Sequence, residues 1–404
     1  MHLLHVINSM DPVSGGPSQG IRNLNKGMQY MDVVREVVCL DSPDSPYLGK
    51  DDFKIHAIGP KKGKWNYSAR LIPWLTDNLG RFDVVIVNGL WLYSSYAAWK
   101  AIRTIKGRGP GMKVPRMLVM PHGMLDPYFQ RAEARKLKAI RNWAYWKLIE
   151  SKVVNSADGL LFTCETELLL ARQTFSSYHP KNEFNVGYGI EAPPLYNQAM
   201  SVAFNKLCPE LNGEPYMLFL SRIHPKKGVD LLLKAYIDLH KEIKLADGNM
   251  PKLVIAGPGM DTRFGKLIQQ ELVNETGVKG DVFFPGMLTG EAKWGAFYGC
   301  DAFVLPSHQE NFGIAVAEAL ACQKTVLITN QVNIWREILN EGAGMVDNDN
   351  LSGVQNILKQ WVRLTKEEKK QFNNRALIAY QNYFTIDAAA KKMLETFSNS
   401  TPLN

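Results

Sequence analysis

Predominantly apolar runs alternate with amphipathic stretches along the first half of the chain. The periodicity of Ile21–Met31 predicts a helix, and a glycine-rich turn, Ser14–Gly20, stands before it. Five runs predict strands: Leu3–Ile7, Val33–Leu40, Val84–Asn88, Met117–Met120 and Gly159–Thr163. Strands without regular polar alternation, separated by helices, are typical of a parallel sheet covered on both faces.

The same pattern starts again after Gly213. Strands are expected at Tyr216–Leu220, Lys252–Ala256, Val282–Phe284, Ala302–Pro306 and Thr325–Thr329, and helices at Gly228–Lys241 and Asp261–Glu275. A proline-rich segment, Ala192–Gly213, predicts a linker between the halves. Since 404 residues exceed the roughly 250–300 over which one core grows, we predict an α/β protein with two doubly wound Rossmann-like domains. These domains, residues 1–200 and 201–381, are expected to face each other across a cleft.

Composition and charge narrow the class of protein. A hydrophobic content of 46% with 21% charged residues is that of a globular protein rather than a disordered one. The net charge of +8 lies in residues 1–200, which carry 25 Lys and Arg against 17 Asp and Glu. This half is expected to meet an anionic partner or to present a basic solubilising surface. The five cysteines form no C-x-x-C pair, no secretory signal is visible, and no run approaches the ~20 apolar residues of a bilayer span, so we expect a cytoplasmic protein.

Charged residues follow two strands of the second half. Arg222 and Lys227 lie between the strand ending at Leu220 and the next helix. A planar guanidinium, an ammonium and a helix N-terminus together suit a diphosphate, although a solvated basic loop has the same composition. Further on, Glu310 lies on a tight loop after Pro306, and Glu318 lies in the helix that follows. A carboxylate can accept hydrogen bonds from two neighbouring hydroxyls, so each glutamate could hold one sugar, whereas Glu318 could also be a surface or capping residue.

These two segments carry a resemblance to a known family. Ser307 to Ala319 matches a Ser-x-x-Glu-x-Phe-Gly-x4-Glu-Ala string, and Ser221 to Gly228 matches a Ser-Arg-x4-Lys-Gly string. In both strings the chain resembles retaining glycosyltransferases of the GT-B fold, specifically glycosyltransferase family 4. The resemblance spans nearly the whole chain and is closest over residues 216–330.

The resemblance implies a role for each matching residue. Arg222 and Lys227 would bind the donor diphosphate, Glu310 the hydroxyls of the donor hexose, and Glu318 those of the ribose. Donor contacts from the backbone are implied for Gly286, Met287, Leu288, Asn311, Phe312 and Gly313. No cofactor and no metal ligand is implied, because the nucleotide sugar is itself a substrate. Asp347-Asn348-Asp349, which looks like a metal-binding D-x-D, is expected in a late surface loop.

Two positions of the first half join this set. Gly15-Gly16 follows the first strand, where glycine permits close approach of a phosphate or sugar but also simply a tight turn. His122 lies at a strand end, where a histidine can be structural; the family's His-Gly approaches the donor sugar, which implies a catalytic role for His122. The resemblance also implies that a C-terminal helix, residues 382–404, packs on the N-terminal domain.

The expected reaction moves a hexose from a UDP- or GDP-linked donor to a glycan or lipid-linked acceptor in cell-surface polysaccharide or glycolipid synthesis. No carboxylate is convincing as a covalent nucleophile. We therefore expect front-face attack, in which Arg222 and Lys227 stabilise the leaving diphosphate. A sugar-nucleotide epimerase of the same fold remains an alternative. A Rossmann oxidoreductase is weaker, because Ser14–Gly20 lacks G-x-G-x-x-G.

Residues 130–152 form a basic segment with interleaved aromatics. Trp143, Tyr145 and Trp146 stand among Arg131, Arg135, Lys136, Lys138, Arg141 and Lys147. Such a helix suits an anionic membrane surface, on the inner face of the membrane for a cytoplasmic protein. The alternative is that Trp143, Trp146 and Leu148 pack inward. No nucleic-acid motif is present, and we expect no nucleic-acid partner.

Overall fold

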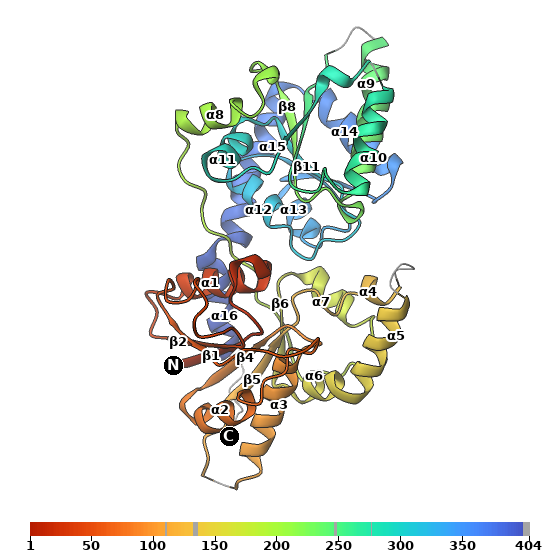
Figure 1. Cartoon of the computed structure of the whole chain (residues 1–404). Helices are drawn as coiled ribbons and strands as arrows, with labels where there is room; N and C mark the ends of the chain where they lie inside the picture. Colours follow the sequence, from red (N-terminus) through yellow and green to blue (C-terminus); the bar gives the residue numbers. More distant parts are fainter. Residues whose placement is uncertain (110, 132–135, 246–248, 276, 399–404) are drawn as a thin grey trace. The chain divides into compact units, whose positions relative to one another are not determined.

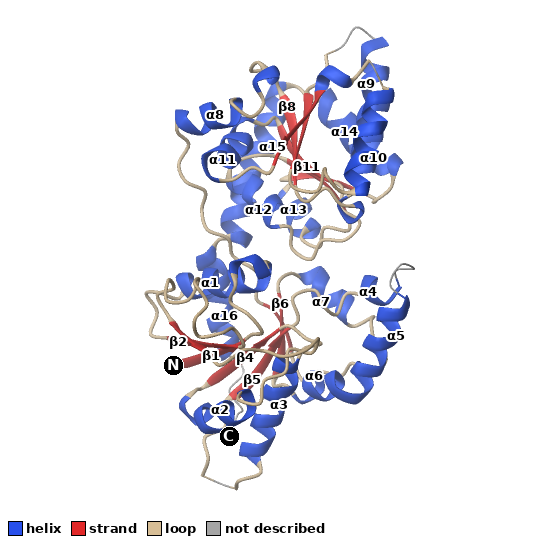
Figure 2. Ribbon diagram, viewed as in Figure 1, coloured by secondary structure: helices blue, strands red, loops and turns tan. Residues whose placement is uncertain are grey.

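The computed structural model describes residues 1–109, 111–131, 136–245, 249–275 and 277–398. These form two compact units, one of residues 1–189 with the segment from Ile386 onward, and one of residues 190–385. Each unit is a parallel sheet with helices on both of its faces (Figures 1 and 2). The expected α/β class with two doubly wound domains is therefore confirmed.

The first unit is built on a seven-stranded sheet in the order β3-β2-β1-β4-β5-β6-β7. Its strands are β1 (His2–Val6), β2 (Val34–Cys39), β3 (Lys54–Ala57), β4 (Val84–Asn88), β5 (Arg116–Met120), β6 (Gly159–Phe162) and β7 (Glu183–Asn185). Its helices are α1 (Gly16–Gly27), α2 (Leu71–Asn78), α3 (Tyr93–Lys106), α4 (Tyr128–Arg131), α5 (Lys136–Tyr145), α6 (Ser151–Ser156), α7 (Glu165–Ala171) and α16 (Ile386–Ser398). The order reverses between β1 and β4, which puts the ends of these two strands at the switch point where such sheets bind ligands.

Two apolar layers cover this sheet. Buried side chains of α2, α3 and α6 form one of them, with Leu75, Ala98 and Val153 among them. Helices α1 and α16 form the other, which includes Ala390 and Met393. A Cβ on Gly27 would lie 2.6 Å from the carbonyl oxygen of Ile386, so these helices approach closely because glycine stands there. Of the expected C-terminal helix, α16 covers residues 386–398 and packs on this unit, and residues 399–404 lie outside the described part.

The second unit has a six-stranded sheet in the order β10-β9-β8-β11-β12-β13. Its strands are β8 (Tyr216–Leu220), β9 (Lys252–Ala256), β10 (Val282–Gly286), β11 (Ala302–Leu305), β12 (Val326–Thr329) and β13 (Gly344–Asp347). Its helices are α8 (Gln198–Asn205), α9 (Val229–Leu245), α10 (Arg263–Asn274), α11 (Gly290–Gly299), α12 (Ile314–Ala321), α13 (Trp335–Glu341), α14 (Leu351–Arg363) and α15 (Lys366–Ala379). Here β8 and β11 flank the switch point, and the predicted phosphate and sugar segments follow these two strands.

The structure differs from the expected elements in the linker, at the sheet edges and near the C-terminal helix. The expected linker contains helix α8, which packs on α11; a Cβ on Gly295 would lie 2.1 Å from the Met200 carbonyl oxygen. Strands β3, β7 and β13 were not expected; each lies at a sheet edge, and none is buried along its whole length. Asp347 ends strand β13 instead of standing in a loop, while Asp349 accepts a hydrogen bond from His308. Residues 380–384 are a π-helical turn of the second unit rather than part of the last helix.

Candidate functional site

The turn after β8 leaves Arg222 exposed and buries Lys227. Residues Pro225–Lys227 form one 3-10 turn, capped by the His224 side chain, which accepts from the Lys226 N–H at 3.1 Å. Gly228 closes the turn at φ 65°, and a Cβ there would lie 2.0 Å from the Pro306 carbonyl oxygen. The turn therefore rests on the end of β11. Arg222 stays exposed, whereas the Lys227 side chain is buried.

The loop after β11 is held from both sides. The Glu310 N–H donates to the Gln331 carbonyl, and the Glu310 carbonyl accepts from the Asn333 N–H, each at 2.9 Å. Gly313 begins α12 at φ 83°, and a Cβ there would lie 3.4 Å from Glu310 Cγ. A glycine is needed at that position because other residues rarely adopt this conformation. Glu310 is thus fixed at the carboxyl end of the sheet by its backbone.

The Lys227 ammonium donates a hydrogen bond to the Glu310 carboxylate. Lys227, predicted to bind the diphosphate, and Glu310, predicted to bind the hexose, are therefore in direct contact. Burial, followed by repulsion from Lys226 and Arg222, lowers the pKa of Lys227 to about 7. A second anion such as a phosphate would therefore stabilise the charged form of Lys227 and raise its pKa.

Glu318 has a partner that the sequence did not indicate. Lys293, on α11, donates to Glu318 Oε1 at 2.6 Å. Burial raises the pKa of Glu318, and the Lys293 charge opposes that rise. A ribose on Glu318 would share the carboxylate with this lysine. Lys293 also lies over the ring of Trp294, at 4.7 Å from its centroid, so its position is fixed from a second side.

The remaining predicted donor contacts lie in two places, at the end of edge strand β10 and in the loop after β11. Gly286 ends β10 at φ 77° and Met287 is 67% exposed, whereas Leu288 is buried. Phe312 is buried against Phe384, edge to face at 5.6 Å. Exposed Met287 fits an apolar contact with a base, while Phe312 presents only its backbone and stabilises the loop. Asn311 lies between Glu310 and Phe312 on the same loop.

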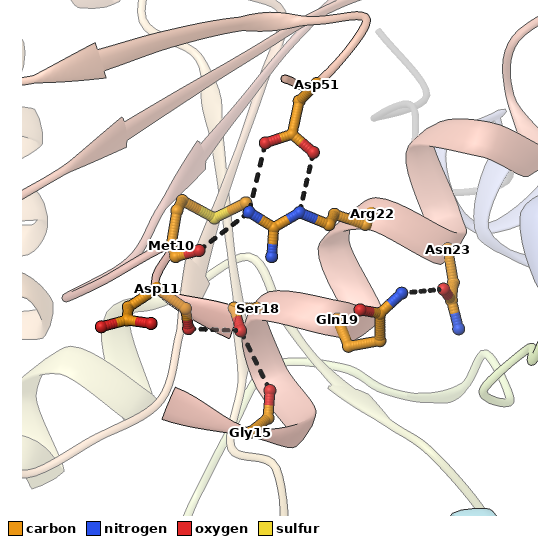
Figure 3. A network of polar contacts seen from close by, with 8 residues as sticks. All are labelled: Met10, Asp11, Gly15, Ser18, Gln19, Arg22, Asn23 and Asp51. Atoms are coloured by element: carbon orange, nitrogen blue, oxygen red, sulfur yellow. Dashed lines mark hydrogen bonds and ion pairs between the residues drawn. The ribbon is translucent and has the colours of Figure 1, made fainter. Parts of the chain in front are cut away.

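In the first unit, polar side chains of α1 contact the segment that leads into α1 (Figure 3). Arg22 bridges the Met10 carbonyl at 2.8 Å and the Asp51 carboxylate at 2.7 Å, and Ser18 Oγ donates to the Gly15 carbonyl at 3.0 Å. Helix α1 begins at Gly16, earlier than expected. No described atom lies within 4 Å of a Cβ built on Gly15 or Gly16, so this backbone is open to approach.

His122 lies in a strained turn at the end of β5. Its φ is 52°, and its Nε2 lies 3.1 Å from Asn88 Oδ1. Burial lowers the pKa of His122 to about 4, so its ring is neutral near neutral pH. The following residue, Gly123, donates its N–H to Glu167, a buried carboxylate of α7 that also accepts from the Thr163 N–H at 2.8 Å. Asn88, Glu167 and Lys293 were missed because buried polar residues on separate elements leave no local sequence pattern.

The basic segment buries some of its aromatic side chains and exposes others. Trp146 is buried and Tyr145 is half-buried, hydrogen-bonded to Trp65. Four apolar side chains are exposed instead: Leu137 (84%), Ile140 (65%), Trp143 (52%) and Leu148 (68%). Lys147 lies 4.3 Å from the Trp143 ring centroid. Inward packing is thus correct for Trp146 and wrong for Trp143 and Leu148, while residues 132–135, including Arg135, lie outside the described part.

The described residues include no candidate metal cluster and no candidate membrane span. Nowhere among them do three or more His, Cys, Asp or Glu side chains gather as metal ligands would. None of their helices combines the length and the hydropathy that crossing a bilayer requires.

Known proteins match the chain in both halves. Residues 208–377 match the family described as glycosyl transferases group 1, and residues 15–181 match the glycosyl transferase 4-like domain. An uncharacterised glycosyltransferase of Methanocaldococcus jannaschii is 29% identical over 255 residues, 56% of this chain and 63% of that protein. A D-inositol 3-phosphate glycosyltransferase of Kineococcus radiotolerans is 29% identical over 201 residues, 48% of this chain and 45% of that protein. The matches thus span 45% to 63% of these relatives' lengths.

The fold has solved counterparts over its whole length. HepE of Anabaena, solved in complex with UDP and glucose, has a TM-score of 0.69 at 16% identity, covering 99% of this chain and 100% of that one. A glycosyltransferase of Rickettsia africae has a TM-score of 0.73 at 15% identity, covering 100% and 99%. At these identities the likeness concerns the fold alone.

Proposed function

Because the chain belongs to the GT-B glycosyltransferases of the family 4 type, with a 4-like domain and a group 1 domain, we propose that it transfers a hexose from a nucleoside-diphosphate sugar to a glycan or lipid-linked acceptor. The observation that carries this proposal is the contact between Lys227 and Glu310. It puts a cation for a diphosphate beside a carboxylate for sugar hydroxyls, at the switch point of the second sheet.

The proposed chemistry retains the configuration of the transferred sugar. The acceptor hydroxyl attacks the anomeric carbon from the side of the leaving group, the bond from that carbon to the diphosphate oxygen breaks, and the acceptor proton passes to the diphosphate. Lys227 and exposed Arg222 stabilise the charge that develops on the leaving group. Because these two cations would neutralise the diphosphate, we propose that transfer needs no metal ion. Product made in excess EDTA would support this, and full loss with recovery by Mg²⁺ would contradict it.

A UDP-linked hexose is the first donor to test. The Anabaena counterpart was solved with UDP and glucose, and exposed Met287 with the turn at Gly286 leaves room for a base held through backbone groups. GDP-linked hexoses are the second choice. We place the product in cell-surface polysaccharide or glycolipid synthesis; an O-antigen chain mannosyltransferase C of Escherichia coli, 23% identical over 257 residues, 62% of this chain and 63% of that protein, supports this by its name.

The test is release of the free nucleoside diphosphate from each donor, with and without acceptor lipid extract. Transfer predicts that release depends on the acceptor and that NMR of the product shows the anomeric configuration of the donor. An epimerase would alter the sugar without an acceptor, and an oxidoreductase would change nicotinamide absorbance. Either outcome with no transfer product would refute the proposed function.

We also propose that the exposed face of residues 136–148 lies on an anionic membrane surface. Leu137, Ile140, Trp143 and Leu148 expose apolar area beside Lys138, Arg141 and Lys147. An apolar face flanked by cations fits the boundary between acyl chains and acidic headgroups. Such docking would hold the enzyme at the level where a lipid-linked acceptor presents its sugar.

A further inference from the structure

Three polar side chains form a continuous chain in the first unit. Asn88 Nδ2 lies 3.2 Å from His5 Nδ1, and Asn88 Oδ1 lies 3.1 Å from His122 Nε2. Sheet pairing brings them together: β1 and β5 both flank β4, and Asn88, the last residue of β4, pairs with Met120. Asn88 and His5 are 5% and 1% exposed, so water does not compete for their hydrogen bonds.

A backbone carbonyl decides which way the Asn88 amide faces. Asn88 Nδ2 donates to the Ile86 carbonyl at 3.1 Å. A carbonyl oxygen can only accept, so the nitrogen of the amide must lie on that side, and the assignment does not depend on either histidine. Asn88 Oδ1 therefore faces His122 as an acceptor, and the second Nδ2 hydrogen faces His5.

Both histidine tautomers follow from this orientation. His122 Nε2 must carry a proton, because its neighbour Asn88 Oδ1 cannot donate one. His5 Nδ1 must accept, so the proton of neutral His5 is on Nε2. Burial is the main cause that lowers the pKa of His5 to about 3 and that of His122 to about 4, so both rings are neutral near neutral pH. In neutral His122, Nδ1 is consequently an acceptor.

We infer that Asn88 is a positioning residue that holds His122 as the neutral Nε2–H tautomer, with Nδ1 left to accept a hydrogen bond from a substrate hydroxyl. The last part rests on the proposed function. His122 Nδ1 bonds to no described residue, and the turn that carries it is fixed by Glu167 at Gly123. A ring held in this way orients a hydroxyl and does not supply positive charge to the reaction.

His5 is the last member of the hydrogen-bonded series that runs from His122 through Asn88. Its Nε2 is buried without a partner among the described residues, and His5 lines a cavity of about 20 Å³. That is room for a single water, which could accept from the Nε2–H. Ile21, Leu24 and Met393 line the same cavity, and their apolar side chains explain why a charge on His5 is disfavoured.

The first test reads the tautomers directly and needs no turnover. The intact protein is labelled with 15N-histidine, and long-range proton–nitrogen NMR identifies the protonated ring nitrogen of each histidine at neutral pH, with His5→Gln and His122→Gln used only for assignment. We expect Nε2–H in both rings. In Asn88→Asp the two amide donors are lost, so His5 should change to Nδ1–H, and the carboxylate should raise the pKa of His122. A protonated Nδ1 in wild-type His122, or unchanged rings in Asn88→Asp, would overturn the inference.

The second test separates positioning from stability. Asn88→Leu should lower kcat/KM by roughly 10- to 100-fold, the range for residues that orient a functional group. Asn155→Leu is the matched control, because Asn155 also uses both its donor and its acceptor, to Ser177 and His179, on the far side of the unit. Both variants should lose melting temperature, but only Asn88→Leu should lose activity and the His122 tautomer. Equal activity losses in the two variants would contradict a positioning role.

The two proposals fail separately. If the expected tautomers are found and every donor is inert, the proposed function is wrong and the tautomer assignment stands. If transfer occurs while UDP-glucose, GDP-mannose and the acceptor lipid extract all leave the Nδ1 resonance of His122 unmoved, the substrate contact is wrong and the proposed function stands.

Discussion

The ammonium of Lys227 donates to the carboxylate of Glu310 across 83 residues of sequence. Lys227 comes from the turn after β8 and Glu310 from the loop after β11, which are neighbouring strands. A bound nucleotide sugar would offer its diphosphate to the lysine and its hydroxyls to the glutamate. Donor binding would then replace part of this internal contact with contacts to the ligand, and the contact orients both side chains beforehand.

Lys227→Met should abolish most turnover without unfolding the protein. Removing one charge that stabilises a developing anion costs roughly 10²- to 10³-fold in kcat. Methionine fills the buried space of the lysine stem, but Glu310 loses its cation, so the melting temperature should fall while the protein stays folded. Steady-state rates with the best donor are the measurement, and Lys234→Met, an exposed lysine on the next helix, is the control. Full activity in Lys227→Met would remove this lysine from the mechanism.

Donor binding should take up a proton at mildly alkaline pH. In the protein without donor, burial lowers the pKa of Lys227 to about 7, so a large share of its side chain is neutral above that pH. An adjacent diphosphate raises the pKa, so calorimetry in buffers of different ionisation enthalpy should show uptake approaching one proton at about pH 8 and less at about pH 6. A nucleotide sugar is the proper ligand, since its diphosphate does not titrate near neutral pH. Equal uptake in Lys227→Met would assign the proton to another group.

The two glycines of the first turn should respond differently to alanine. Gly15 has φ 86° and ψ −147°, a region nearly confined to glycine, so Gly15→Ala should destabilise the protein by about 1–3 kcal/mol. Gly16→Ala should leave stability unchanged, because Gly16 has helical geometry and its Cβ meets no described atom. If the turn contacts donor or acceptor, Gly16→Ala should still raise a KM. Denaturant titration and kinetics of both variants decide this; an unaffected KM would make the turn purely structural.

Lys293→Met should destabilise the second unit in a pH-dependent way. Glu318 would keep its buried position but lose its cation, at a cost of about 1–3 kcal/mol. Burial already raises the pKa of Glu318, and removing Lys293 raises it further. The cost falls on the ionised form, so the loss of melting temperature should be larger at alkaline pH than at acidic pH. Lys266→Met, exposed on α10, should show no such trend; a pH-independent loss in Lys293→Met would contradict the ion-pair explanation.

Binding to acidic vesicles should depend on the exposed face of residues 136–148. Phosphatidylglycerol vesicles should co-sediment with the wild type, while Leu137→Ser with Ile140→Ser should bind at least about 100-fold more weakly, because each apolar side chain contributes about 1.5–3 kcal/mol when fully buried. Neutral phosphatidylcholine vesicles and added salt should reduce binding as well. A suitable control is Leu245→Ser, an equally exposed leucine of α9 in the second unit. Unchanged binding by the double variant would refute the proposed surface.

The central strands could be predicted from the sequence, and the roles of the segments after β8 and β11 stay predictions. Strands β4, β8 and β9 have the expected bounds, since a strand buried on both faces must be a continuous apolar run. Edge strands β3 and β7 could not be found, because half-exposed positions carry no such run. Helix α8 was hidden by the prolines around it and is fixed by packing on α11, a contact that local sequence does not encode.

The sequence by itself determined the class of protein: apolar runs specify two parallel sheets, and the strings around Arg222 and Glu310 carry the resemblance to the glycosyltransferase family. Only the tertiary structure decided which charges meet. It paired Lys227 with Glu310 and Lys293 with Glu318, and it joined His5, Asn88 and His122 through neighbouring strands. The physical reason is that hydrophobic patterning acts within a segment, whereas protonation and ion pairing depend on burial and on partners that only the order of strands in the sheet brings within a few ångströms.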